Sequence, residues 1–429
     1  MKNKIYIGLL GLGTVGFGVY KVLKMQQENM QQKLGCEVEI KKILVRNMEK
    51  AAKKLGDDSL LTNNINDIIN DKEIDIVVEL MGGQEPARTY MLDALKAGKN
   101  VVTANKDIVA ETGHELFVTA RENNLDIYFE AAVAGGIPII RPLKRCLAGN
   151  NIDEIVGIVN GTTNFILTKM TQEGMDYSQA LALATELGYA EADPTADVEG
   201  YDAGRKVAIM ASVGFNSAVH FSDVYTEGIT KIAAKDISAA DDMGYVIKLL
   251  GITKNTEDGI EASVTPMLID KGHSLASVND SFNAVCVHGD AVGDTMFYGR
   301  GAGELPTASA VVGDIFDITR NIQNGCTGCI EWECSSQKSI KDKNEICNKY
   351  FLRFITEDRC GVLAAVTGAF AKYNVSIEQI SQKGKTKDGK AEIVVMTDIV
   401  KARNLNASVE AIADLDVVDS IASLIRVYA

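Results

Sequence analysis

The sequence lacks an excess of positive charge. Its 429 residues contain 44 lysines and arginines against 58 aspartates and glutamates, which gives a net charge of −14 at pH 7. Non-specific binding of nucleic acid requires a basic surface, so this balance argues against a nucleic-acid partner. No apolar run is long enough to span a membrane, and glycines interrupt the apolar segment after Lys2 and Lys4, which disfavours a signal peptide. We therefore expect a cytoplasmic protein that does not bind membranes.

Histidines and cysteines at the spacing of metal ligands are also scarce. The four histidines are scattered, and none has a partner at the spacing of a metal site. Cys326 and Cys329 form a CxxC pair, but no second close pair of cysteines or histidines follows to complete a zinc site. Without a secretory signal, the eight cysteines are expected to be reduced thiols. A redox role for Cys326 and Cys329 stays open.

The chain does contain a strand–helix alternation near its start. A chain of 429 residues is too long for a single hydrophobic core, so we expect two or three domains. Over residues 1–130 the pattern predicts strands near 4–10, 38–45, 74–80, 100–103 and 126–130, with a helix from about 15 to 31 after the first strand. This alternation predicts a doubly wound parallel sheet of the α/β class, whose ligands bind at the carboxyl ends of the strands.

A glycine-rich loop follows the first predicted strand. Gly11, Gly13 and Gly16 form GxGxxG between a strand and a helix, the context in which this motif binds the pyrophosphate of a dinucleotide. The second strand ends at Arg46, where an NAD-preferring site would place an acid. An arginine can pair with a 2′-phosphate, so NADP(H) is favoured; NAD(H) use and a plain surface arginine stay open.

Two further features lie at the carboxyl ends of later strands. Thr103 and Lys106 fall at such an end, which makes Lys106 a candidate site residue. After Glu130, the AAVAGGIPII segment turns tightly through Gly135 and exposes several main-chain carbonyls. Carbonyl oxygens suit a hard cation, although a tight interdomain turn explains the same segment.

The densest group of charged residues lies between Gly188 and Met210. Pro194 and the glycines exclude a continuous helix until Asp202, where helical spacing begins and places Asp202 and Lys206 one turn apart. A solvated acidic loop that caps a helix is the alternative to a catalytic cluster. In this α+β part of the chain we expect a strand at 152–159, helices at 177–187, 202–215 and 236–250, and strands near 260–265, 283–287 and 295–298.

In the remaining sequence, we expect one segment to pack again with the first domain and the last segment to form a separate module. A second glycine-rich loop at 299–304 precedes a helix expected over 307–318, so we expect residues of about 300–320 to rejoin the nucleotide domain. Residues 321–348 are expected to be a linker. The pattern over 349–429 is βαββαβ.

These motifs together resemble the homoserine dehydrogenase family with a C-terminal ACT regulatory domain. The resemblance covers essentially the whole chain. It rests on motifs that look like those of the family at positions 105–106, 130–136, 160–164, 193–206 and 299–314, and on the EDRCGV segment at 357–362. It implies a Rossmann-type NAD(P)-binding domain over 1–130, an α+β substrate-binding and dimerisation domain over 131–300, and an ACT domain over 349–429. The implied reaction is the reversible reduction of L-aspartate 4-semialdehyde to L-homoserine, on the route to threonine, isoleucine and methionine.

The resemblance also implies roles for individual residues. Lys206 would be the acid/base, with Asp202 orienting it and Lys106 across the substrate; Glu191 would hold the substrate ammonium group, with Asp197 also in the substrate site. The implied cofactor contacts are Gly11, Gly13, Thr14, Val15, Gly16, Arg46, Thr103, Lys106 and Gly303. The implied structural sodium site is formed by Glu130, Val133, Gly135 and Ile137.

Regulation and assembly follow from the same resemblance. ACT domains pair across subunits and bind an amino acid, which implies a homo-oligomer (a dimer or tetramer) with threonine as the suspected effector. Two alternatives remain: another amino-acid or semialdehyde dehydrogenase on this scaffold, and a non-catalytic sensor of NAD(P) and amino acids. Glu191, Asp202 and Lys206 argue against a pure sensor, which has no use for that combination.

Overall fold

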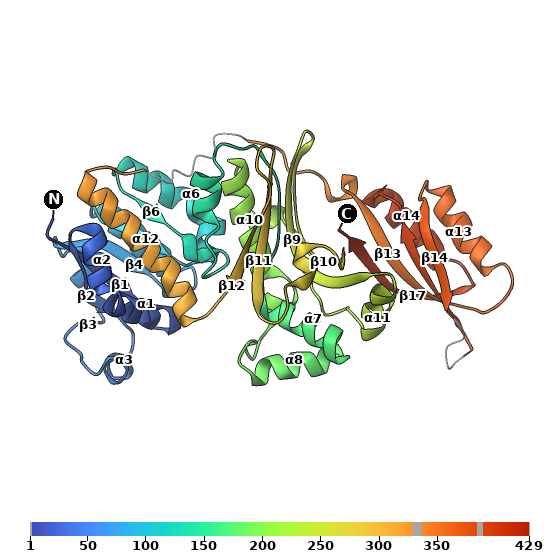
Figure 1. Ribbon diagram of the computed structural model, residues 1–429, viewed down its shortest axis with the longest axis horizontal. Helices are drawn as coiled ribbons and strands as arrows, with labels where there is room; N and C mark the ends of the chain where they lie inside the picture. The colour runs from blue at the N-terminus through green and yellow to red at the C-terminus, as the bar shows by residue number, and fades with distance from the viewer. Residues whose placement is uncertain (1, 329–336, 384–388, 429) are drawn as a thin grey trace. The chain divides into compact units, whose positions relative to one another are not determined.

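The structure, a computed structural model, describes residues 2–328, 337–383 and 389–428 (Figure 1). The chain divides into two compact units. The first consists of Met1–Ile155, Arg205–Asp223 and Asn283–Gln337, and the second of Val156–Gly204, Val224–Phe282 and Lys338–Ala429. Within the described ranges, no helix combines the length and the apolar character that crossing a membrane requires.

The first unit contains a six-stranded parallel sheet with the strand order β3-β2-β1-β4-β5-β6. The strand order reverses direction at β1 and β4, which is the switch point where α/β sheets bind ligands. Its strands are β1 (Lys4–Leu10), β2 (Glu37–Leu44), β3 (Leu61–Thr62), β4 (Ile74–Glu79), β5 (Asn100–Thr103) and β6 (Ile127–Tyr128). The helices between them are α1 (Thr14–Met25), α2 (Gln27–Leu34), α3 (Met48–Leu55), α4 (Asn66–Ile69), α5 (Ala87–Lys96) and α6 (Lys106–Glu122).

A helix from much later in the chain completes the core of this sheet. α12 (Glu304–Asn324) packs against α1, and Figure 1 shows the two helices side by side. A Cβ on Gly18 would lie 2.5 Å from the carbonyl oxygen of Glu304, so only glycine permits this approach. The apolar side chains of both helices join those of β1, β2 and β4 in one core. β1 and β4 are therefore largely hydrophobic, whereas β2 alternates between buried apolar and partly exposed charged residues. The first unit also contains β11 (Phe282–Gly289), which begins at the unit boundary, and β12 (Gly293–Arg300).

The second unit combines helices with a mixed sheet that continues into the C-terminal module. β9 (Tyr245–Thr256) and β10 (Gly259–Asp270) form a long hairpin ladder. β10 then pairs in parallel with β17 (Val418–Val427) at Met267–Arg426 and Leu268–Val427. The order from β9 onward is β9-β10-β17-β13-β15-β14. The helices of this unit before the C-terminal module are α7 (Gly161–Glu173), α8 (Tyr177–Glu186), α9 (Thr195–Val198) and α11 (Ala234–Asp242).

The C-terminal module has the expected βαββαβ order. It comprises β13 (Cys347–Thr356), α13 (Val362–Lys372), β14 (Ile377–Lys383), β15 (Ala391–Thr397), α14 (Ala402–Ala413) and β17, with a short strand β16 (Val400–Lys401). Apolar side chains of β13, β15, α13 and α14 form its core. On β13, Arg353 forms an ion pair with Asp236 of α11 at 2.8 Å, and both side chains are almost fully buried. This pair and the β10–β17 ladder join the module to the rest of the second unit.

The fold class expected from the sequence is confirmed. One predicted helix runs wrongly into a strand, and three other elements are found at the predicted places with different bounds. The helix expected over 236–250 ends at Asp242, because Gly244 turns the chain at φ +87° and the β-branched segment after it pairs with β10 as β9. The helix expected over 15–31 breaks at Gln26 into α1 and α2. The helix expected over 307–318 extends from Glu304 to Asn324. The strand expected over 126–130 is only Ile127–Tyr128, because Glu130 begins a 3-10 turn.

Candidate active site

The glycine-rich loop joins β1 to α1 with the geometry that a dinucleotide requires. Gly11 has φ +97°, and a Cβ on Gly16 would lie 2.2 Å from the carbonyl oxygen of Gly11. A Cβ on Gly13 would meet no atom within 4 Å, so this glycine faces open space. The first turn of α1 contains no acid, and no side chain caps its N-terminus, which leaves main-chain N–H groups for phosphate oxygens. Thr14 and Val15 form that first turn.

Two cations lie near this loop. Arg46 is exposed just after β2, where Asn47 caps α3 by accepting a hydrogen bond from the Lys50 N–H at 2.9 Å. Lys54, on the same helix, donates to the carbonyl oxygens of Leu12 and Gly13 at 3.3 and 3.1 Å. The sequence indicates Arg46 but not Lys54, because the contact of Lys54 depends on how α3 packs and has no signal in the sequence.

A buried carboxylate holds the ends of β4 and β5 together. Glu79 accepts hydrogen bonds from the Thr103 hydroxyl and the Met81 N–H, both at 2.7 Å. The Thr103 hydroxyl oxygen in turn accepts from the Asn105 N–H at 3.0 Å, and the Asn105 side chain donates to the carbonyl of Gly83 at 2.7 Å. Burial raises the pKa of Glu79. Glu79 was not selected from the sequence, although a carboxylate that ends a buried parallel strand just before two glycines is a usable signal.

The two candidate lysines lie beside an ion pair of the first unit. Lys106 is the first residue of α6, and Lys206 lies in α10 (Tyr201–Phe215). Their chain neighbours Asp107 and Arg205 form an ion pair at 2.9 Å. This pair brings the first turn of α6 beside the start of α10. The structure therefore brings together the chain positions of Lys106 and Lys206, and both lysines are half-buried.

In the second unit, one amide brings together two of the candidate carboxylates. Asn160 caps α7 and accepts from the Thr163 N–H at 2.8 Å. Its side-chain nitrogen donates to Asp197 at 2.7 Å and to Asp202 at 2.9 Å. Asp202 is only 8% exposed and lies one helical turn before Lys206 in α10. The sequence analysis gave Asn160 no role of its own, because its partners lie far away in the chain.

The other predicted site residues occupy two different environments. Glu191 is exposed in the loop before α9, and Gly303 has φ +127° at the start of α12. Glu130, Val133 and Ile137 are buried at the turn that contains Gly135. The Glu130 carboxylate accepts from the N–H groups of Ile139, Ile140 and Arg141 at 2.6, 2.8 and 2.9 Å. Its main-chain carbonyl is therefore the group that fits a cation site.

The turn at Gly135 is strained and closely packed. Ala134 and Gly135 have φ of +56° and +55°, and a Cβ on Gly135 would lie 2.2 Å from the carbonyl oxygen of Gly301. A donor set of main-chain carbonyls in a rigid turn fits a hard monovalent cation. Of the CxxC pair, Cys326 is exposed, while Cys329 lies outside the described residues.

Comparisons with known proteins cover nearly the whole chain. Residues 11–130 match the family model "Homoserine dehydrogenase, NAD binding domain", residues 138–316 the model "Homoserine dehydrogenase", and residues 350–417 the model "ACT domain". A homoserine dehydrogenase of Bacillus subtilis (strain 168) is 45% identical over 424 residues, which cover 99% of this chain and 98% of the relative. The chain belongs to the homoserine dehydrogenase family. The family resemblance and the oxidoreductase class expected from the sequence are thereby confirmed.

Solved structures of homoserine dehydrogenases agree with this assignment. A homoserine dehydrogenase from Thiobacillus denitrificans has a TM-score of 0.94 and 42% identity, with 99% of this chain and 98% of that chain covered. A hyperthermophilic archaeal homoserine dehydrogenase mutant in complex with NADPH has a TM-score of 0.63 and 28% identity, with 74% of this chain and 98% of that chain covered. The NAD(P)-binding domain of the family is thus present in this chain.

A buried lysine supports the α7 region of the chain. Lys248 of β9 is 3% exposed and donates to the carbonyl oxygen of Val278 at 2.6 Å, to Asn279 at 3.1 Å and to Asn164 at 3.2 Å. Asn164 lies one turn after Asn160 in α7. Burial lowers the pKa of Lys248 to about 8.

This lowered pKa predicts a pH-dependent stability. Between about 8 and the ordinary value of 10.5, the unfolded chain binds more protons at Lys248 than the folded chain, so the free energy of unfolding rises with pH in this window. A shift of this size corresponds to about 3 kcal/mol. We expect the thermal midpoint of the wild type, relative to Lys248→Met, to increase between pH 7 and pH 10. Parallel pH profiles for the two proteins would contradict the lowered pKa of Lys248.

Proposed function

We propose that the chain catalyses the reversible, NAD(P)H-dependent reduction of L-aspartate 4-semialdehyde to L-homoserine, a step toward threonine, isoleucine and methionine. The observation that carries the proposal is the Asn160–Asp197–Asp202 cluster one turn before Lys206, within a chain of this family. The reduced nicotinamide supplies the hydride. The protein must then hold the aldehyde and supply a proton to its oxygen.

Lys206 is the proposed proton donor. The aldehyde oxygen gains negative charge as the hydride arrives, and an ammonium group beside it both stabilises that charge and protonates it. Asp202 orients Lys206 from the preceding turn, and Asn160 holds the Asp202 carboxylate through a hydrogen bond at 2.9 Å. Lys106 is proposed to add a second positive charge at the substrate. Glu191 and Asp197 are proposed to bind its ammonium group.

Another dehydrogenase on this scaffold is the alternative function. The test is oxidation with NADP⁺ of L-homoserine, L-serine and other small hydroxy-amino acids, followed by the absorbance of the reduced nicotinamide. The proposal expects kcat/KM for L-homoserine to exceed that of each other substrate by at least about 100-fold. A higher value for another substrate would favour the alternative, and no turnover of any would favour the sensor.

NADP(H) is the proposed preferred cofactor. The support is the pair of cations, Arg46 and Lys54, near the glycine loop, together with the absence of an acid at the end of β2. We expect Arg46→Glu to raise KM for NADPH by about 10- to 100-fold while changing KM for NADH little, because only NADPH carries the 2′-phosphate. Steady-state kinetics with both cofactors would measure this. An equal change for both would contradict the assignment of Arg46.

We further propose that the carbonyls of Glu130, Val133, Gly135 and Ile137 hold a sodium ion with a structural role. The support is a rigid turn whose available oxygens are main-chain carbonyls, since the Glu130 carboxylate is already bonded to three N–H groups.

Regulation is proposed to act through the ACT domain in a homo-oligomer, with threonine as effector. Gly361 has φ +93° at the start of α13, where no side chain caps the helix, so main-chain N–H groups are free to bind an amino-acid carboxylate. We expect threonine to inhibit the full-length wild type, and Gly361→Asp, which adds a negative charge there, to raise the inhibitory concentration at least about tenfold. Gly368→Ala, in the middle of the same helix with no atom within 4 Å of the new Cβ, is the control. Equal inhibition of Gly361→Asp and the wild type would contradict this site.

A further inference from the structure

Two adjoining cavities of the second unit lie where β17 meets β10 and β8 (Tyr225–Thr226). Both are lined by Tyr225, Lys343, Tyr350 and Arg426. β10 and β17 pair at only two positions, and β8 pairs with β10 at Ser263 and Val264 instead. The cavities therefore flank the short ladder between the two strands. We treat them as one site and call it the Arg426 site.

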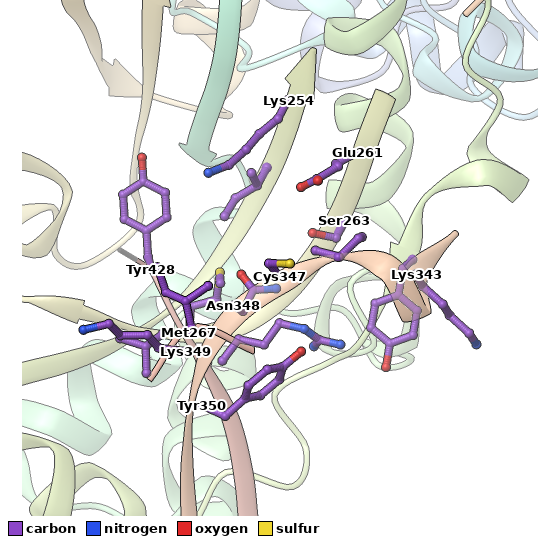
Figure 2. A pocket seen from close by; sticks show the side chains of 16 residues that line it. Lys254, Glu261, Ser263, Met267, Lys343, Cys347, Asn348, Lys349, Tyr350 and Tyr428 are labelled. Atoms are coloured by element: carbon purple, nitrogen blue, oxygen red, sulfur yellow. The ribbon is translucent and has the colours of Figure 1, made fainter. Parts of the chain in front are cut away.

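The lining of the Arg426 site is positively charged. Five cations line it against two acids, in a chain whose net charge is −14. Both acids are already paired: Glu227 with Arg426 at 3.1 Å, and Glu261 with Lys341 at 2.7 Å. Of the cations, Lys349 pairs with Glu378 outside the lining at 2.6 Å. Figure 2 shows part of this lining around the first cavity. The five cations are Lys231, Lys254, Lys343, Lys349 and Arg426. A concave, positively charged surface attracts anions.

Arg426 is held rigidly at the centre of the site. Its side chain is 18% exposed, its guanidinium lies 4.8 Å from the ring centre of Tyr225, and one of its nitrogens donates to Glu227. A guanidinium has five N–H donors in a planar fork, so these contacts fix its position without using all of its donors. Lys343 lies 5.5 Å from the centre of the same Tyr225 ring. An oxyanion would thus meet one fixed cation and one exposed, adjustable cation.

The wall of the Arg426 site also contacts α9, the short helix that carries the candidate carboxylate Asp197. Glu227 and Gly228 line the site, and the next residue, Ile229, donates its N–H to the carbonyl oxygen of Val198 at 2.8 Å. A Cβ on Gly228 would lie 2.1 Å from that same oxygen, so the two segments are in direct main-chain contact. Val198 lies between Asp197 and Asp202, the two carboxylates that Asn160 holds.

We propose that the Arg426 site binds a small organic anion bearing a carboxylate or phosphate group, and that its occupancy changes turnover. The anion would pair with Arg426 and Lys343. It would thereby shift the contact between Arg426 and Glu227, the residue before Gly228. That segment transmits the change through Val198 to α9, which carries Asp197, and to the start of α10, which carries Asp202. The site is separate from the substrate site and from the proposed amino-acid site at Gly361.

The binding test uses the full-length protein with sodium phosphate and sodium malonate as probes, at constant ionic strength, by isothermal titration calorimetry. We expect saturable binding of at least one probe, and binding at least about tenfold weaker in Lys343→Glu. Lys372→Glu is the matched control, because Lys372 is also exposed and lies 5.3 Å from the ring centre of Tyr373, but is not part of the lining. Binding of only one probe identifies the anion as a phosphate or a carboxylate. No saturable binding, or equal binding by Lys343→Glu and wild type, overturns the site.

The kinetic test adds the bound probe to the turnover assay and therefore rests on the proposed function. We expect the probe to change kcat or KM in the wild type and in Lys372→Glu, but not in Lys343→Glu. Binding without any kinetic effect overturns the regulatory role. Because calorimetry requires no turnover, a failure of the proposed reaction would leave the binding result intact and would be recognised separately.

Discussion

Replacing Lys206 with alanine is expected to lower kcat by about three orders of magnitude or more, while the affinity for NADPH changes little. General acid catalysis contributes about 10²- to 10⁴-fold, and stabilisation of the charge on the aldehyde oxygen adds to it. Lys206 lies in α10, one turn after Asp202, and the glycine loop that is proposed to bind the cofactor is a different segment. Steady-state kinetics and cofactor titration by nicotinamide fluorescence would measure the two quantities independently.

Two further variants separate the roles of the candidate lysines. Lys206→Arg retains the positive charge but cannot release a proton near neutral pH, so it should remain severely impaired if Lys206 is the acid. Lys106→Ala should mainly raise KM for the substrate if Lys106 only binds and stabilises charge. A Lys206→Ala enzyme within about tenfold of wild type, beside an inactive Lys106→Ala enzyme, would move the proton transfer to Lys106.

The second large effect is expected at the glycine loop, where two single-methyl changes should act differently. Gly16→Ala places a Cβ 2.2 Å from the carbonyl oxygen of Gly11, so it should disrupt the β1–α1 turn and lower the thermal midpoint of the apoprotein. Gly13→Ala meets no atom within 4 Å and should leave the apoprotein as stable as wild type. Its methyl group instead occupies the open side of the loop and should raise KM for NADPH by about 10- to 100-fold.

These two variants also test whether this loop is the phosphate site. The required measurements are thermal unfolding of the apoproteins and calorimetric titration with NADPH. If Gly13→Ala bound NADPH like the wild type, the pyrophosphate would have to approach a different surface.

The parts of the structure that could be predicted from the sequence are those encoded locally. The GxGxxG turn and the Asp202–Lys206 spacing depend on a few neighbouring residues, and both have the predicted local geometry. The βαββαβ order of the C-terminal module was likewise readable from its periodicity. In contrast, β9 was predicted as helix because its apolar segment fits both periods, and only its pairing with β10 selects the strand.

Site features that depend on packing between distant segments were not predictable. Asn160 joins Asp197 and Asp202 across about 40 residues of chain, and Lys54 reaches the glycine loop only because α3 packs beside it. Glu79 has its role only because β4 and β5 are neighbours in the sheet. None of these contacts leaves a regular spacing in the sequence. The residue types indicated which side chains are candidates for the site, and the fold determines which of these side chains are in contact.

In the proposed reaction, the reduced nicotinamide delivers a hydride to the aldehyde carbon of L-aspartate 4-semialdehyde while the protein adds a proton to the oxygen. The most direct measurement is mass spectrometry of the product after turnover of this substrate with NADPH deuterated at C4 of the nicotinamide, using each stereoisomer of the label in turn. We predict L-homoserine with one deuterium on its hydroxyl-bearing carbon from one stereoisomer and none from the other. A product other than homoserine, or homoserine without deuterium from both stereoisomers, would contradict the account.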